Sequence, residues 1–109
     1  MLTSMTAFSC DYPARPFIPD GATASKEELL AAKDDVQTYL QSVDEYLQCV
    51  ELEEEAASAA RDDLTSEQQE ELNQSLNRKF DAANEEKEMV GEQFNQQVRA
   101  YNAERKKSD

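Results

Sequence analysis

The 109-residue chain has no histidine, no tryptophan, and only 2 glycines, 3 prolines and 2 cysteines. Without histidine it lacks the commonest general base and the commonest neutral metal ligand. The sequence also contains no glycine-rich phosphate loop and no nucleophile elbow. Two cysteines cannot complete a structural zinc site by themselves. We therefore expect a protein that is not an enzyme and that holds no cofactor or metal.

Positive charge and long apolar runs are also scarce. The 11 lysines and arginines are outnumbered by 24 acidic residues, which gives a formal net charge of -13. Such a charge opposes binding to nucleic-acid phosphates and to anionic membrane surfaces. No run approaches the roughly 18 apolar residues that a membrane-spanning helix needs. We expect neither a nucleic-acid partner nor insertion into a membrane.

Apolar residues recur at spacings of three, four and seven in two long stretches. They are Leu29, Val36, Leu40, Val43, Leu47, Val50 and Ala57, and then Leu72, Leu76, Phe80, Ala83, Val90, Phe94, Val98 and Tyr101. This spacing places each set on one side of a helix. The segment between them is long enough only for a turn. The sequence therefore predicts an all-α fold, an antiparallel, coiled-coil-like hairpin of two helices.

Capping residues define the expected ends of these helices. Ser25 and Glu28 have the spacing of a capping box, and Thr65 and Gln68 repeat it. We predict helices over residues 26–60 and 66–104, within a hairpin domain of residues 25–109. Gly91 is predicted to permit close approach of the first helix, because a glycine inside a helix otherwise only weakens it.

The predicted core is thin, because a two-helix hairpin buries about one stripe per helix. Lys33, Glu54 and Lys87 interrupt that stripe, so we expect the seam between the helices to be half open. Such a chain needs a disulfide, a dimer or both, and a homodimer would give a four-helix arrangement. The open seam near Met89, Val90 and Phe94 is an expected surface for an unidentified protein partner.

Residues 1–9 have the character of the end of a secretory signal peptide. They are uncharged, and small residues, Ala7 and Ser9, precede Cys10 at the required spacing. The alternative is a disordered terminus. Export would place the protein in the periplasm or outside the cell. A cysteine directly after a small residue also leaves open a small envelope lipoprotein with a lipidated Cys10.

Residues 10–24 are predicted to form an extended arm. Pro13, Pro16 and Pro19 exclude a helix and favour a polyproline-like path. The order Pro19, Asp20, Gly21 is a turn signal. The arm needs a surface to pack on, because the segment has no core of its own.

A second stripe on the first helix, which includes Tyr39, Tyr46 and Cys49, is the available surface. The arm is long enough to run antiparallel along this stripe and to bring Cys10 to Cys49. We predict a Cys10–Cys49 disulfide, the alternative being two unrelated thiols. The predicted arm-packing residues are Phe17, Ile18, Tyr39 and Tyr46, and we expect Phe17 or Ile18 to contact Tyr39 or Tyr46.

The turn between the helices is strongly acidic. Nine carboxylates share it with one cation, Arg61. Clustered carboxylates can bind cations weakly, but the spacing is not that of a calcium loop. A solvated end, a weak cation site and a basic protein partner are the alternatives. The acidic residues are Glu51, Glu53, Glu54, Glu55, Asp62, Asp63, Glu67, Glu70 and Glu71.

The stretch from Cys10 to Val50 resembles a group of small exported proteins of Gram-negative bacteria that have no assigned function. The shared pattern is a cysteine, spaced prolines, Ile-Pro-Asp-Gly, an acidic helix start and Tyr-Leu-x-Cys. The stretch from Phe94 to Tyr101 is similar as well. The resemblance implies export and pairing of the two cysteines, and it implies no reaction. The short leader of this chain departs from the pattern and bears on localisation.

Overall fold

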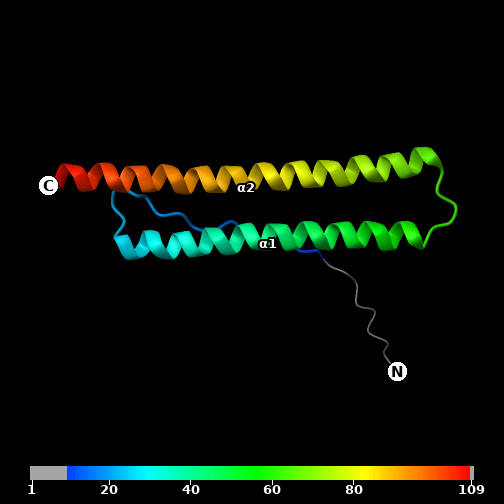
Figure 1. The fold of residues 1–109 in the computed structure, drawn as a ribbon, viewed down its shortest axis with the longest axis horizontal. Helices are drawn as coiled ribbons and strands as arrows, with labels where there is room; N and C mark the ends of the chain where they lie inside the picture. The colour runs from blue at the N-terminus through cyan, green and yellow to red at the C-terminus, as the bar shows by residue number, and fades with distance from the viewer. Residues whose placement is uncertain (1–9, 109) are drawn as a thin grey trace, which may run out of the picture.

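The computed structural model describes residues 10–108, which form two antiparallel helices and an extended N-terminal arm (Figure 1). Helix α1 spans Lys26–Ala59 and helix α2 spans Ser66–Ser108. The predicted all-α hairpin is confirmed. Helix α2 continues beyond residue 104 because cations in its last turn suit the negative end of the helix dipole. The interpretation of residues 1–9 as a signal remnant lies outside the described residues.

Both predicted helix starts are capped as expected. At α1, the Glu28 backbone N–H donates to Ser25 Oγ at 3.1 Å, and the Ser25 backbone N–H donates to Glu28 Oε1 at 3.4 Å. At α2, the Gln68 backbone N–H donates to Thr65 Oγ1 at 3.1 Å, and Thr65 N–H donates to Gln68 Oε1 at 3.0 Å. These side chains satisfy backbone donors that the first helical turn leaves without partners.

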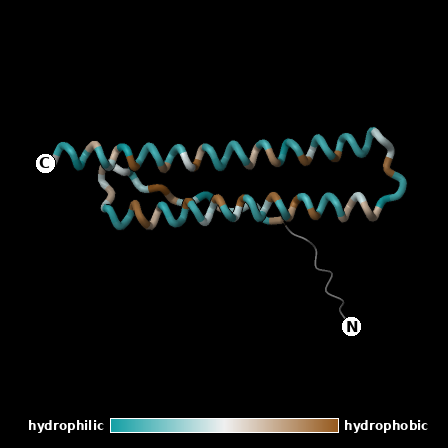
Figure 2. Tube along the Cα trace, viewed as in Figure 1, coloured by the Kyte–Doolittle hydropathy of each residue, from teal (hydrophilic) through white to brown (hydrophobic). Residues whose placement is uncertain are grey.

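The seam between the helices is tightest near its middle. Val43, Ala83 and Val90 are essentially inaccessible to solvent, with exposed fractions of 0%, 1% and 1%. Leu72 and Leu76 toward the turn, and Phe94 and Val98 toward the open end, are only partly buried. The apolar residues of both helices lie mostly along the side that faces the other helix (Figure 2). The hairpin is therefore held by a short central core and opens toward both ends.

The arm contacts both helices, whereas the sequence predicted contact with the first helix alone. It starts beside Cys49 of α1 and crosses to α2, where Gly21 meets Gln97 (Figure 1). The chain then reverses at Asp20, whose backbone oxygen accepts from the Thr23 and Ala24 backbone N–H groups at 3.1 and 2.9 Å. The predicted turn is thus present. The arm crosses because the groove between two packed helices buries more of its surface than one helix face would.

Gly91 does not have the predicted role. A Cβ atom added at this position would have no atom within 4 Å outside its own helix segment. Gly91 lies on the side of the hairpin away from the arm and does not mediate the approach of α1. The close approach belongs instead to Gly21, where an added Cβ would lie 1.8 Å from the Gln97 backbone oxygen.

Candidate interaction surface

The structure brings Cys10 and Cys49 to disulfide distance, with the two Sγ atoms 2.08 Å apart and the Cα atoms 5.7 Å apart. The bond closes a loop between residues that are 39 positions apart and fixes the start of the arm on α1. The carboxylate of Glu53, one turn further along α1, lies 3.2 Å from Cys10 Sγ.

Tyr12 contacts both Tyr46 and Tyr39, the residues that Phe17 or Ile18 was predicted to contact. Its ring meets the ring of Tyr46 edge to face, with centroids 5.0 Å apart and an angle of 73°. Its hydroxyl lies 3.2 Å from the hydroxyl of Tyr39, within hydrogen-bond distance. The predicted antiparallel path of the arm along α1 already implied the contact between Tyr12 and Tyr46. Tyr12 follows Cys10 by two residues and Tyr46 precedes Cys49 by three, so a disulfide must place the two rings side by side.

Of the two arm residues predicted to pack on the hairpin, Ile18 does so and Phe17 does not. Phe17 is 82% exposed, whereas Ile18 packs against the buried cluster that includes Val43 and Tyr39. In an extended chain successive side chains point to opposite sides. Only one of these two neighbours can therefore face the hairpin. Of the four predicted arm-packing residues, Ile18, Tyr39 and Tyr46 are brought together and Phe17 is not.

Arg15 fastens the middle of the arm to α2. Its guanidinium is hydrogen bonded and ion paired to the Glu86 carboxylate and lies 3.3 Å from the sulfur of Met89. The hydrogen bond and the charge of Glu86 raise the pKa of Arg15 above its usual value. Sequence reasoning missed this contact, because it requires the arm to cross from one helix to the other.

Tyr39 is the buried tyrosine on the side of the hairpin that the arm covers. It is 3% exposed, and burial together with the hydrogen bond to Tyr12 raises the pKa of its hydroxyl well above the ordinary value of 10. The phenol therefore stays protonated and structural. Among residues 10–108, no buried side-chain nitrogen or oxygen is left without a hydrogen-bond partner.

The opposite side of the hairpin has no cover within the described residues, and we call it the arm-free face. On α1 it includes Lys26, Lys33 and Leu40, which follow one another at intervals of seven residues. Asp44, one helical turn after Leu40, and Glu51, seven residues later, lie on the same face. Residues at this spacing share one helix face. Tyr39, Tyr46 and Cys49 lie on the other side. The hairpin seam is therefore sealed by the arm on one side and accessible on the other.

A groove of about 450 Å³ lies at the open end of the arm-free face. Its floor is apolar, and its rim carries Lys26, Lys33 and Arg105. Within residues 10–108 none of these three cations is in an ion pair. In a chain of net charge -13, the open end thus presents positive charge that is not neutralised by an ion pair within the described residues. The apolar residues of the groove are Leu29, Leu30, Phe94, Val98 and Tyr101.

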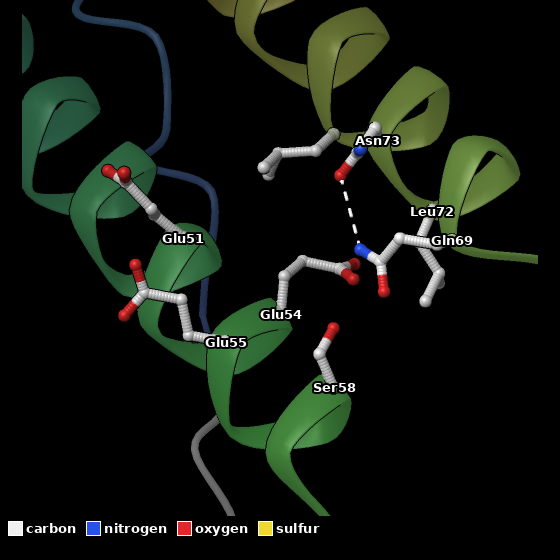
Figure 3. Close-up of a pocket in the computed structure, with 8 residues that line it drawn as sticks. Glu51, Glu54, Glu55, Ser58, Gln69, Leu72 and Asn73 are labelled. Atoms are coloured by element: carbon white, nitrogen blue, oxygen red, sulfur yellow. Dashed lines mark hydrogen bonds between the residues drawn. The ribbon is translucent and has the colours of Figure 1, made fainter. Parts of the chain in front are cut away.

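A second groove, of about 380 Å³, lies on the same face near the turn between the helices (Figure 3). Its acidic rim comes from Glu51, Glu54 and Glu55 of α1, and Leu72 and Leu76 of α2 line it. Glu54 is loosely paired with a lysine of α2 at 3.9 Å. Glu51 and Glu55 are in no ion pair within residues 10–108. The two grooves therefore have rims of opposite charge.

The middle of the arm-free face separates the grooves. The Lys87 ammonium donates to the Asp44 carboxylate across the seam at 2.7 Å. Lys87 was expected to interrupt the apolar seam, but its ammonium group is paired with the Asp44 carboxylate at the surface. Gly91 lies one helical turn after Lys87 and leaves a notch, because it has no side chain. The partly buried Phe80 lies two helical turns before Lys87.

The acidic turn does not form a cation site in the part of the chain that the structure describes. Among residues 10–108 no three acidic or cysteine side chains converge as a metal site requires. Neither helix in this range contains an apolar stretch long enough to cross a membrane. Comparisons with protein families, with curated proteins and with solved structures found no match to the chain. The surface itself therefore carries the functional argument.

Proposed function

We propose that this chain is an exported, non-enzymatic helical hairpin that acts through protein–protein contacts made by its arm-free face. One observation carries the proposal. The seam of the hairpin is covered by the arm on one side, whereas on the other side two charged, apolar-floored grooves face solvent. A helix pair with one open seam is suited to accept a further amphipathic helix.

Apolar side chains are more deeply buried on the arm side of the hairpin than on the arm-free face, as the proposal requires. On the arm side, Ala32 and Tyr39 are each only 3% exposed. On the arm-free face, Leu30 is 52% exposed beside the partly buried Phe94. Apolar side chains around an open groove gain free energy when a partner removes them from water. The lack of histidine in the sequence further favours binding over catalysis.

Export is supported by the cysteine pair. Disulfides persist in oxidising compartments and are rare in the cytosol, and here the arm depends on one for its anchor at Cys49. The resemblance of Cys10 to Val50 to small exported bacterial proteins supports the same compartment. We therefore propose a periplasmic or secreted protein.

A photoreactive amino acid at Leu30 tests the binding surface. The matched control is the same amino acid at Thr38, which is exposed on the side of α1 away from α2 and from the arm-free face. Irradiation of cells that express each variant should give a discrete protein adduct from position 30 and none from position 38. Equal labelling at both positions, or none at position 30, would contradict binding through this face.

The compartment and the lipoprotein alternative are tested by the chemistry of Cys10. Acid quenching of cells followed by thiol alkylation should leave both cysteines unmodified until a reductant is added. Mass spectrometry of the peptide that contains Cys10 then decides the alternative. A lipid thioether on Cys10 Sγ excludes the bond to Cys49, so a lipidated peptide would overturn the disulfide-anchored arm, and free thiols in cells would argue against export.

A further inference from the structure

We propose that the partner of the arm-free face is a second copy of this chain, packed antiparallel to the first. This inference rests on the proposed function, because it names the occupant of the same face. In the proposed dimer α1 lies over α1 and α2 over α2 of the second copy, with the two arms outside. The result is a four-helix arrangement in which each open end covers the turn end of the other copy.

Charge complementarity is the first argument. The groove at the open end has a rim of Lys26 and Lys33, and the groove near the turn has a rim of Glu51 and Glu55. An antiparallel dimer places each basic rim against the acidic rim of the other copy, twice by symmetry. A parallel dimer would instead place Glu51 and Glu55 against themselves. Complementary charges of this kind set the orientation of an interface.

The shape of α2 gives the second argument. Gly91 leaves a notch on the arm-free face, and Phe80 of the same face is a large, partly buried side chain. In the antiparallel dimer Phe80 of one copy fills the notch at Gly91 of the other. A glycine at such a point permits close approach of the second helix. It also accounts for a residue that costs α2 stability and has no packing role within residues 10–108.

The two arguments give the same two-fold axis. Pairing Lys33 with Glu55 of the second copy places the axis at position 44 of α1. Pairing Phe80 with Gly91 of the second copy places it between positions 85 and 86 of α2. Asp44 and Lys87 are ion paired across the seam at 2.7 Å and lie at or beside these points. One axis therefore satisfies the charge match on α1 and the shape match on α2.

The net charge of each copy opposes association, and this fixes the conditions of the test. At 0.15 M salt the Debye length is about 8 Å, so charges remote from the interface are largely screened while close pairs still act. We expect sedimentation equilibrium at this ionic strength to show a reversible dimer in the micromolar range. A protein that stays monomeric up to about 1 mM would overturn the dimer.

Two double variants test the orientation. Lys26→Glu with Lys33→Glu makes both rims acidic, and Glu51→Lys with Glu55→Lys makes both rims basic. Each variant alone should self-associate at least tenfold more weakly than the wild type. An equimolar mixture should restore the dimer, because every open end then meets a turn end of opposite charge. The control, Asp34→Lys with Glu45→Lys, changes the charge equally on the outer side of α1 and should have no comparable effect.

Gly91→Leu gives an independent readout. The monomer has room for the new side chain, so helix content and thermal stability should be retained or increased, while dimerisation should weaken at least tenfold. If the mixture of charge variants stays monomeric, or if Gly91→Leu dimerises normally, the proposed packing is wrong. In either case a specific adduct from Leu30 with a different protein would leave the proposed function standing, whereas its absence would remove both.

Discussion

The backbone N–H of Gly21 donates to Oε1 of Gln97 at 2.8 Å, and the Gly21 backbone lies so close to α2 that it leaves no space for a side chain. A Cβ at this position would lie 1.8 Å from the Gln97 backbone oxygen. The contact ties the end of the arm to the second helix just before the chain turns into α1. It is the point at which three segments of the fold meet.

The two glycines should therefore respond to alanine in opposite directions. Gly21→Ala forces backbone apart and should lower the free energy of unfolding by about 1–3 kcal/mol. Gly91→Ala should raise it by about 1 kcal/mol, because the site is open and alanine is the better helix former. Urea denaturation at low micromolar concentration measures both. Equal effects of the same sign would show that the arm does not press on α2.

Reduction of the disulfide should loosen the arm and leave the hairpin folded. The loop between Cys10 and Cys49 spans 39 residues, so in the chain-entropy model the bond contributes about 3–4 kcal/mol. The melting temperature should fall by at least about 10 °C on reduction. Far-UV circular dichroism should change little, because Val43 of α1 and Ala83 and Val90 of α2 belong to one buried cluster, to which the arm adds Ile18 at the edge.

The double replacement Cys10→Ser with Cys49→Ser is the control for this measurement. Its melting temperature should match that of the reduced protein and should be insensitive to reductant. A large loss of helix on reduction would mean that the arm is required for the hairpin itself. A melting temperature of the wild type that is indifferent to reductant would mean that the disulfide does not stabilise the fold.

Tyr12 and Phe17 should differ in their contributions to stability. Tyr12→Ala removes the edge-to-face contact with Tyr46 and the hydrogen bond to Tyr39, and should cost about 1–2 kcal/mol. Phe17→Ala should change the stability by less than about 0.5 kcal/mol, because its side chain is 82% exposed. Chemical denaturation of the two variants provides the comparison, and a larger cost at Phe17 would place the arm in a different register.

The buried phenol of Tyr39 predicts an alkaline limit to stability. Its folded-state pKa is raised above the ordinary value of 10.0, so its contribution is complete below about pH 10 and is lost as the pH rises further. Spectrophotometric titration should show one of the 4 tyrosines ionising only with unfolding. In Tyr39→Phe this late step should be absent, and its persistence would assign the protected group to another tyrosine.

The sequence was sufficient to predict the hairpin, because its determinants are local. The spacing of Val36, Val43 and Leu47 defines the buried side of α1, and the side chains of Ser25 and Thr65 mark where the helices begin. These signals depend on residues three or four positions apart. They can be recognised without knowing what the helices pack against.

The path of the arm was only partly predictable. The order of the two cysteines indicated where it begins, but an extended chain has no period that selects one helix over another. Contacts such as Arg15 with Glu86 and Gly21 with Gln97 exist only because the arm enters the groove between the helices.

A half-open seam was predicted near Met89, Val90 and Phe94, but Val90 is buried and Met89 contacts Arg15 of the arm. Of these three residues, Phe94 lines the groove of the arm-free face. The opposite rims of that face at Lys33 and Glu51 required the relative placement of both helices.

The bond between Cys10 and Cys49 also divides the molecule into a covalent ring and an open segment. The arm and the first two thirds of α1 belong to the ring, whereas α2 lies wholly outside it. A protease that cuts between residues 11 and 48 leaves the two pieces joined. A cut in the turn between Ala59 and Ser66 leaves α2 attached only by non-covalent contacts, which include packing, ion pairs and the hydrogen bond from Gly21 to Gln97. Within residues 10–108 the turn is the only covalent connection between the two helices. Resistance to cleavage at the turn therefore determines whether α2 stays covalently attached.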